Sequence, residues 1–353
     1  MSIKPLDVIV VPDFTGKSHR LFEIRTLFFL ASWLETDSYK SHCPLHVACI
    51  GEPPKSVCWL AEKCSAAITV HEPLLTGGFY NKLRGLEIKG TTAHGLLLDV
   101  DIILLANISS LASLLASNCI SAAVENDAHL CNSQWIDIYA NFGINPPQER
   151  ISTLNAMLKG YIPSERGCDE SATSAFPYYN AGVISFPWKC GLELRNLWED
   201  SIEKIKLILN EESQKGIEYV KRAFSSNQPA LAITIELLKQ QGYQFGYLPN
   251  ETHTRWQHIY LGLVNFEQIK LIHTIGSFRR IDSKIDSSKG FGNHVIRNKV
   301  IKAFIGEVTY ESAYFKTKVW QRLFKALRVT YQIDSKVKDL YNKWVRLALN
   351  TPN

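Results

Sequence analysis

The sequence lacks any apolar stretch that could cross a bilayer as a helix, which takes about 18 or more uncharged residues. The nearest approach, Leu21 to Leu34, is interrupted by Glu23 and Arg25. Residues 1–13 also lack the basic and apolar pattern of a secretory signal. We therefore expect a soluble protein that works in the cytoplasm.

The eight cysteines include no Cys-x-x-Cys pair and are scattered through apolar segments. This pattern argues against a disulfide framework or a zinc site and favours reduced thiols in the core. The chain also has no internal repeat, no low-complexity segment and no Gly-rich phosphate loop of the Walker or Rossmann kind.

The formal net charge of +5 is mild and comes from the C-terminal end. Residues 301–353 hold ten Lys and Arg against four Asp and Glu, which gives +6 and leaves the preceding 300 residues close to neutral. No basic stripe with interleaved aromatic residues runs through the main body. A nucleic-acid partner is therefore not expected.

At 353 residues and 46% hydrophobic composition, the chain can form a full core in one large α/β domain or in two smaller ones. Apolar, β-branched runs alternate with helical patterns. Such alternation predicts an α/β fold with a mostly parallel sheet and helices on both faces, with ligands at the carboxyl ends of the strands. We expect strands at 6–11, 45–50, 66–70, 96–98, 120–124, 178–187, 244–248 and 269–273, and helices at 19–33, 54–64, 78–89, 192–209 and 228–241.

Two aspartates interrupt the apolar run from Gly95 to Leu105. Leu96 to Leu98 is typical of a central strand that is covered on both faces. Because residues two apart on a strand point the same way, Asp99 and Asp101 should converge at its end, where a buried carboxylate pair needs a cation or solvent. A divalent metal would satisfy both groups. The alternative is that Asp99 caps the strand and Asp101 starts a turn.

The stretch 126–177 is predicted to be irregular, because Pro and Gly residues interrupt it repeatedly. Such a stretch in a compact domain is usually functional, often as a lid or an acceptor-binding loop. The alternative is a variable surface insertion.

Several short motifs follow one another along the chain. They are Asn81-Lys82-Leu83, Asp99-Val100-Asp101, Asn180-Ala181-Gly182-Val183, Asn227-Gln228, Leu248-Pro249-Asn250-Glu251 with Arg255, and His273-Thr274-Ile275-Gly276-Ser277-Phe278-Arg279. In this order they resemble the motifs of GT-A fold nucleotide-sugar glycosyltransferases, most closely glycosyltransferase family 8, the glycogenin and bacterial galactosyltransferase group. The resemblance covers residues 6–282 and leaves the C-terminal tail outside it.

The resemblance implies that Asp99 and Asp101, with His273, hold a divalent metal that bridges the two phosphates of a nucleotide-sugar donor. Carboxylate and phosphate oxygens suit Mg²⁺ or Mn²⁺, and an imidazole nitrogen favours Mn²⁺. Without the other motifs, His273 would be interpreted as a buried histidine at a strand end. Val100 and Gly276 would belong to the same donor site.

Arg279 stands where the family usually has a lysine and keeps its positive charge. Its planar guanidinium could bind a diphosphate with two hydrogen bonds. The metal and Arg279 would stabilise the negative charge on the departing nucleoside diphosphate, so that no strong nucleophile is required.

The same resemblance assigns roles to further polar residues. Asn180 and Gln228 would bind hydroxyl groups of the donor sugar or the acceptor, and Lys82 would lie near the donor phosphates or sugar. The loop with Asp13 and Thr15 would hold the base and ribose. The alternatives are a strand-end hydrogen bond for Asn180, a polar residue at a helix N-terminus for Gln228, and a solvated helix face for Lys82.

Asn227 departs from the family, which usually has an aspartate before the glutamine. An amide cannot act as a carboxylate nucleophile or base, which weakens a double-displacement mechanism. Retention through a front-face reaction is still expected, because the family resemblance implies it.

The expected function is transfer of a sugar from a nucleoside diphosphate sugar, expected to be a UDP-sugar, to a glycan, lipid or other hydroxyl acceptor. One rival is a sugar-1-phosphate nucleotidyltransferase, which normally has a Gly-rich loop where this chain has Pro12 to Lys17 with a single glycine. The other is a non-catalytic binding or scaffold protein, suggested by Asn227. Against it, the expected metal ligands Asp99, Asp101 and His273 are all present.

Residues 1–290 are expected to form the transferase domain and residues 291–353 a basic helical extension. In the extension, Val308 to Arg328 and Lys336 to Leu349 are typical of two amphipathic helices, with Lys and Arg around an apolar face. These faces either dock on the domain or attach the protein peripherally to the inner face of an anionic membrane, near a lipid-linked acceptor.

Overall fold

The computed structural model describes residues 5–16, 19–74, 78–115, 119–125, 130, 132–152, 174–214, 227–254 and 269–273. The chain divides into two compact units. Unit 1 consists of Met1–Pro73, Leu98–Leu114 and Pro249–Asn353, and unit 2 of Leu74–Leu97 and Leu115–Leu248.

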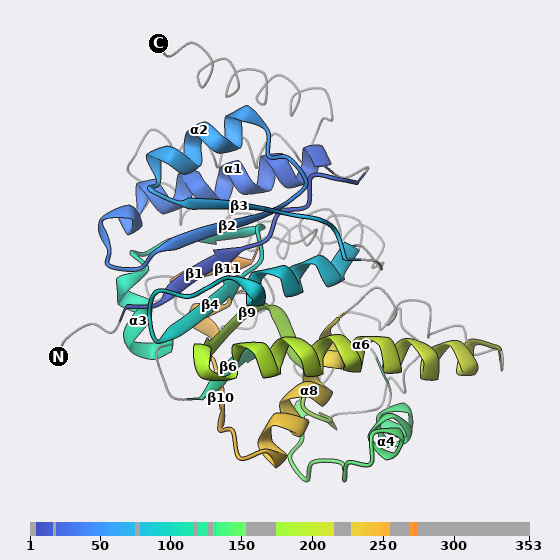
Figure 1. Ribbon diagram of the computed structural model, residues 1–353. Helices are drawn as coiled ribbons and strands as arrows, with labels where there is room; N and C mark the ends of the chain where they lie inside the picture. The colour runs from blue at the N-terminus through green and yellow to red at the C-terminus, as the bar shows by residue number, and fades with distance from the viewer. Residues whose placement is uncertain are drawn as a thin grey trace, which may run out of the picture. The chain divides into compact units, whose positions relative to one another are not determined.

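Seven strands form one sheet in the order β10-β6-β9-β4-β1-β2-β3 (Figure 1). The pairs β1 with β2, β2 with β3, and β6 with β10 are parallel, whereas β9 runs antiparallel to β6. The mostly parallel sheet, with helices between its strands, confirms the predicted α/β class. Its strands are β1 (Asp7–Val10), β2 (Leu45–Ile50), β3 (Ala67–His71), β4 (His94–Leu98), β6 (Ile120–Val124), β9 (Tyr179–Pro187) and β10 (Phe245–Tyr247).

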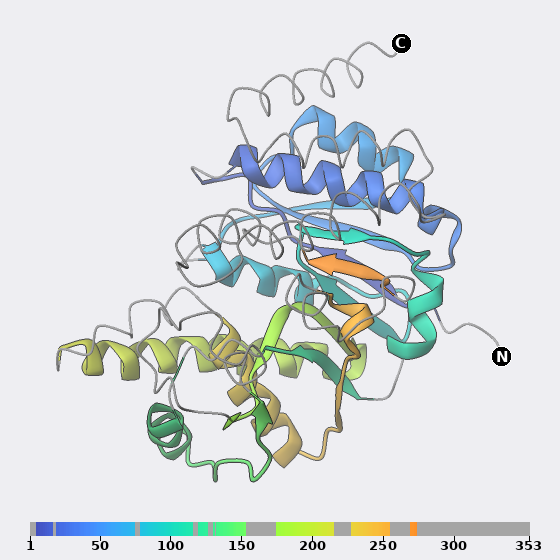
Figure 2. The same ribbon diagram turned by 180° about the vertical axis from the view of Figure 1, so that it is seen from behind.

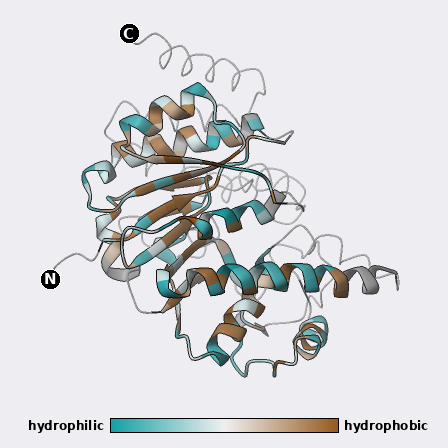
Figure 3. Ribbon diagram, viewed as in Figure 1, coloured by the Kyte–Doolittle hydropathy of each residue, from teal (hydrophilic) through white to brown (hydrophobic). Residues whose placement is uncertain are grey.

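In unit 1, strands β1 and β2 are buried along their whole length, and both are coloured largely hydrophobic in Figure 3. Such continuous burial is expected of apolar runs that are covered on both faces. Two more strands, β5 (Ile102–Leu104) and β11 (Leu271–His273), pair antiparallel; β11 is the orange strand of Figure 2. This short ribbon places the C-terminal end of β11 opposite the beginning of β5.

Helix α1 (His19–Glu35) packs against α2 (Lys55–Lys63) and against β5. Its second half is apolar on most sides, and Phe29 and Trp33 are fully buried. Ser32 is also buried, and its Oγ accepts a hydrogen bond from the Leu104 N–H at 3.1 Å. This bond joins α1 directly to β5, the strand that follows the two aspartates.

In unit 2, helix α6 (Gly191–Gln214) packs against α8 (Gln228–Gln240), and α8 packs against β9. The side chains of Leu194, Trp198 and Ile202 form a buried face of α6. Figure 3 shows the corresponding alternation of hydrophobic and hydrophilic segments along this helix. This periodic burial is typical of an amphipathic helix with one face in the core.

Two sequence predictions need correction. The predicted helix at 78–89 is a 3₁₀ helix, η2 (Gly78–Glu87). The prediction that 126–177 is irregular is wrong for α4 (Asn132–Asn141), which ends just before Gly143, a residue with a positive φ of 66°. The remaining short elements are η1 (Ser38–Lys40), α3 (Ser109–Leu115), the antiparallel pair β7 (Ile151–Ser152) and β8 (Ser174–Ala175), η3 (Trp188–Cys190) and η4 (Asn250–Thr252).

Gly95 lies in β4 against the ring of Phe186. A Cβ atom at Gly95 would lie 2.5 Å from Phe186 Cζ, and Phe186 is fully buried. Because the ring has packed neighbours, we expect Gly95→Ala to lower the free energy of unfolding by about 1–3 kcal/mol through overpacking, as measured by urea denaturation. Phe186→Leu removes the ring and serves as the partner in a double-mutant cycle. If the two substitutions change the free energy of unfolding additively, the added Cβ atom at residue 95 does not collide with the Phe186 ring.

None of the helices in the described parts of the chain is long and apolar enough to cross a membrane. The two amphipathic helices predicted within 291–353 lie outside the described residues. Docking of the tail and its attachment to a membrane both stay predictions.

Candidate functional site

The two aspartates lie in a tight turn between β4 and β5. Strand β4 ends at Leu98, β5 begins at Ile102, and the Ile102 N–H donates to the Asp99 carbonyl oxygen at 3.1 Å. Asp99 and Asp101 are therefore brought together by a turn, not by the alternation of a continuing strand. The prediction that strand alternation makes Asp99 and Asp101 converge is therefore wrong in its geometry, although the two carboxylates do lie close together.

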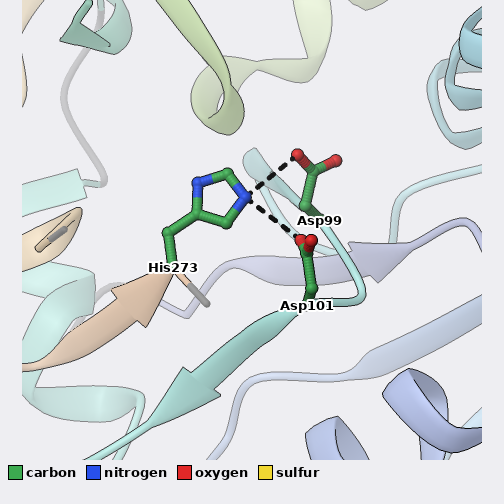
Figure 4. Close-up of side chains that lie close together, drawn as sticks. All are labelled: Asp99, Asp101 and His273. Carbon is green, nitrogen blue, oxygen red and sulfur yellow. Dashed lines mark hydrogen bonds and ion pairs between the residues drawn. The ribbon is translucent and has the colours of Figure 1, made fainter. Parts of the chain in front are cut away.

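His273 joins the aspartates from the end of β11. The antiparallel register of β11 and β5 places His273 opposite Ile102, the residue after Asp101. His273 Nε2 lies 3.1 Å from Asp101 Oδ1 and 3.5 Å from Asp99 Oδ2 (Figure 4). One ligand atom from each residue lies within 4.8 Å of the others, so that the three form a candidate metal-binding group.

The candidate metal-binding group combines two carboxylates with one imidazole and is mostly buried. Asp101 is 7% exposed and His273 only 2%, whereas the Asp99 side chain is 25% exposed. Burial alone lowers the pKa of His273, but the charge and hydrogen bond of Asp101, together with Asp99, outweigh burial and raise that pKa. The two carboxylates thus stabilise positive charge at this position.

The geometry of the group fits a small divalent cation. Neighbouring ligands of an octahedral ion with bonds of about 2.1 Å lie roughly 3 Å apart. The separations of 3.1 and 3.5 Å between His273 Nε2 and the carboxylate oxygens are close to that spacing. Two carboxylates and one imidazole are also a donor set that Mn²⁺ accepts.

A second histidine lies behind His273. His253 Nε2 is 2.7 Å from His273 Nδ1, and His253 is fully buried. The backbone supports the contact, because the Thr254 N–H donates to the Leu271 carbonyl and the His273 N–H donates to the Thr254 carbonyl. Sequence reasoning missed His253, although it lies between the Leu248–Glu251 motif and Arg255.

Arg25 of α1 is a further residue beside this group that sequence reasoning missed. Its Nη1 lies 3.5 Å from Asp101 Oδ2, and its side chain is 28% exposed. In the sequence, Arg25 was noticed only as a charge that interrupts an apolar stretch. The available signal was a cation inside the otherwise apolar stretch 21–34, where Glu23 is the other charged residue.

The loop after β1 is held at the end of β2. The Phe14 N–H donates to the Ile50 carbonyl at 2.9 Å, and the Thr15 N–H and Oγ1 both donate to Asp13 Oδ1, at 2.9 and 2.7 Å. Gly51 has a φ of +73°, and a side chain there would meet Thr15 Cγ2 at 2.6 Å. Asp13 therefore shapes this loop, and Thr15 is exposed on it.

In unit 2, Asn180 lies at a bulge in β9. The register with β6 shifts between Ala122 and Ala123, which pair with Ile184 and Asn180 respectively. The buried Asn180 donates through Nδ2 to Glu125 Oε2 at 2.9 Å, and its Oδ1 accepts from the Gly182 N–H at 2.7 Å. Bulges often redirect side chains near functional sites. Glu125, which is 3% exposed, was not singled out from the sequence.

Lys82 reaches the same bulge. Its Nζ donates to the Ala181 carbonyl at 2.7 Å, an oxygen that the bulge removes from regular pairing with β6. The neighbouring Asn81 is buried and accepts the Leu74 N–H through Oδ1 at 2.8 Å. The structure thus brings Lys82 and Asn180 to one part of unit 2, and Lys82 does not lie on a solvated α-helix.

Asn227 and Gln228 mark the beginning of α8. Asn227 is buried at the N-cap position without a side-chain cap, and its carbonyl accepts the Trp198 Nε1–H at 3.0 Å. Gln228 is the first helical residue and is partly buried. Gln228 thus lies at a helix N-terminus, as the alternative interpretation has it, and its binding of a sugar hydroxyl stays a prediction.

The remaining predicted donor-binding residues fall in two groups. Val100 is 5% exposed at the centre of the aspartate turn, so its side chain packs inward. Gly276 and Arg279 lie outside the described residues, as does Arg255.

No model of a known protein family matches the chain, and no curated protein does. Glycosyltransferases are among the solved structures that the chain resembles. They include GlyE of Streptococcus pneumoniae TIGR4, with a TM-score of 0.42 and 14% identity over 91% of this chain and 63% of GlyE. Galactosyltransferase LgtC, in complex with donor and acceptor sugar analogues, has a TM-score of 0.42 and 12% identity over 84% of this chain and 95% of LgtC.

Mouse xyloside xylosyltransferase 1 in its apo form has a TM-score of 0.42 and 11% identity, over 77% of this chain and 98% of that enzyme. The chain thus spans 63% of the length of GlyE and nearly all of the other two.

Proposed function

We propose that the protein is a metal-dependent glycosyltransferase that uses a nucleoside diphosphate sugar, specifically a UDP-sugar. The observation that carries this proposal is the group of Asp99, Asp101 and His273, converging from the β4–β5 turn and the end of β11. The group lies at the carboxyl end of β4, the end at which ligands bind in parallel α/β sheets.

Within unit 1, the chain's own residues would bind and orient the donor diphosphate. Asp99 and Asp101 supply the negative charge that holds a divalent cation, and His273 supplies a nitrogen ligand on a rigid strand. When bound, such a cation supplies Lewis-acid stabilisation of the diphosphate leaving group. Arg279 and Gly276 belong to the proposed donor site by the motif resemblance, with Mn²⁺ as the proposed ion.

Within unit 2, the bulge of β9 is the proposed sugar-recognition element. Two hydrogen bonds lie there: Asn180 donates to Glu125, and Lys82 donates to the Ala181 carbonyl next to Asn180 in the chain. Amide, carboxylate and ammonium groups supply both donors and acceptors for sugar hydroxyls. Gln228 is proposed as a further hydroxyl-binding residue. Retention of anomeric configuration is proposed from the family resemblance.

A non-catalytic protein that binds nucleotide sugars is the second candidate. One observation favours it: Asn227, which stands where the family has an aspartate, is buried at the beginning of α8, and its backbone holds Trp198. An amide is neither a nucleophile nor a base, so residue 227 offers no carboxylate for the reaction.

A thermal-shift screen of nucleotide sugars with and without Mn²⁺ tests the proposed function. A ligand that binds only the native state stabilises it by about 2.7 kcal/mol at 100 times its Kd. We expect a UDP-sugar to raise Tm in the presence of Mn²⁺ and to lose most of this effect in excess chelator. Donor hydrolysis, measured as released UDP, then separates transferase from binding protein.

Asp37→Asn serves as a control variant, because it removes a carboxylate outside the candidate metal-binding group. Asp37 is exposed, and its ion pair with Lys40 is on the surface of unit 1. This variant should behave as the wild type in every ligand condition. Equal shifts with and without Mn²⁺ would contradict metal dependence, and metal-dependent shifts without UDP release would favour the non-catalytic candidate.

A further inference from the structure

We propose that Arg25 couples cation binding to diphosphate binding: its guanidinium holds Asp101 when no cation is bound and transfers to the donor diphosphate when one is. This inference rests on the proposed function, because it requires the candidate metal-binding group to take a divalent cation. It assigns a role to a residue that lies outside every motif of the family resemblance.

The two oxygens of Asp101 have different partners. Oδ1 lies 3.1 Å from His273 Nε2, and Oδ2 lies 3.5 Å from Arg25 Nη1. The Arg25 contact is longer than a good N–H to oxygen hydrogen bond, so it is an ion pair held mainly by charge. Arg25 thus holds Oδ2 by its charge, while Oδ1 is the oxygen that lies next to His273 at the proposed cation position.

Arg25 has a more exposed side chain than Asp101 and is the one that we propose to move. Asp101 is 7% exposed and held by the turn, whereas the Arg25 side chain is 28% exposed. Arg25 is followed in α1 by Thr26, which is buried and donates to the Phe22 carbonyl at 2.7 Å. Helix α1 also packs against α2 and β5, and the movement we propose is confined to the long arginine side chain.

The local charges favour such a transfer. With Asp99 and Asp101 ionised and Arg25 charged, these three groups carry a net charge of −1. A divalent cation reverses the sign of this sum and repels the guanidinium, since like charges close together destabilise each other. A diphosphate that binds to the cation brings negative charge back, and arginine binds phosphate oxygens through two parallel hydrogen bonds.

Arg25 therefore weakens binding of the cation alone and strengthens binding of the cation together with the diphosphate. In thermodynamic terms this is positive coupling, and it is reciprocal: the diphosphate strengthens cation binding by the factor by which the cation strengthens diphosphate binding. Removal of the guanidinium should affect the two binding steps in opposite directions. A side chain that only supported the fold would weaken both.

The experiment measures the Mn²⁺ affinity of the full chain by electron paramagnetic resonance of free Mn²⁺, with and without saturating UDP. For Arg25→Gln, we expect Mn²⁺ alone to bind about tenfold more tightly than to the wild type. The gain in Mn²⁺ affinity on adding UDP should shrink by about tenfold, within the usual range of roughly 5- to 150-fold for coupled sites. Arg25→Lys keeps the charge, and both of its Mn²⁺ affinities should lie between those of the wild type and those of Arg25→Gln.

Lys40→Gln is the matched control, because it removes one positive charge from the same unit at an exposed ion pair with Asp37. It should leave both Mn²⁺ affinities unchanged. Weaker Mn²⁺ binding by Arg25→Gln without UDP, or an unchanged gain on adding UDP, would overturn the inference alone. No Mn²⁺ binding by the wild type would overturn the proposed metal site, and the inference with it. Circular dichroism melting of both Arg25 variants verifies that they fold.

Discussion

Asp101→Asn is expected to weaken Mn²⁺ binding by more than about 100-fold and to abolish sugar transfer. Loss of an outer partner of a metal ligand typically costs 10- to 100-fold in affinity, so loss of a ligand charge should cost more. Asp101 is the carboxylate closest to His273, and after the change Asp99 is the remaining carboxylate of the group. Mn²⁺ titration and UDP release measure the two effects.

The fold should survive this change, because asparagine has nearly the shape of aspartate and the turn is closed by backbone atoms of Asp99 and Ile102. Circular dichroism of Asp101→Asn should therefore match the wild type. Asp37→Asn, the exposed carboxylate control, should retain both Mn²⁺ binding and transfer. Unchanged transfer in Asp101→Asn, or full wild-type activity in excess chelator, would exclude a metal-dependent reaction.

The strands of the sheet were predictable from the sequence because their signals are local. Strands β2 and β6 match the predicted ranges, since each is a short apolar run that ends at a polar residue or a glycine. Helix α8 was equally clear, with a proline in its first turn and an apolar pattern that ends at Gln240. In these segments, propensity and burial favour the same structure.

The turn at Asp99 shows where local reasoning failed. In the apolar run from Gly95 to Leu105 we predicted one strand, at 96–98, and extended its alternation to the aspartates that follow; the run contains β4, a turn and β5. Strand β5 does not continue β4; it pairs with β11, which lies about 170 residues later in the sequence. Pairing over such a separation leaves no periodic signal in either segment.

The candidate metal-binding group was predictable only in part, for the same reason. The spacing of Asp99 and Asp101 is visible in the sequence, and the motif resemblance indicated His273. Arg25 and His253 belong to no motif, and they reach the group through α1 and through the segment beside β11. Residues that act through another residue are identified by contacts, which only the folded chain shows.

His253→Phe is expected to weaken Mn²⁺ binding by about 10- to 100-fold, the usual effect of losing the outer partner of a metal-binding histidine. His273 can present a lone pair at Nε2 to a cation only when its proton is on Nδ1. His253 Nε2, 2.7 Å from that nitrogen, is placed to accept this proton in a hydrogen bond. Phenylalanine fills the fully buried position but accepts no hydrogen bond.

His253→Gln distinguishes this role from packing. Its side-chain oxygen can still accept the hydrogen bond, so it should retain more Mn²⁺ affinity than His253→Phe although its shape differs more from histidine. Nitrogen chemical shifts of His273 provide a second measurement, since they report which ring nitrogen carries the proton. If His253→Phe binds Mn²⁺ like the wild type, His253 does not position His273. If both variants lose affinity and melting temperature equally, the contact between the two histidines serves the fold of unit 1, and the orientation of His273 is determined by β11 alone.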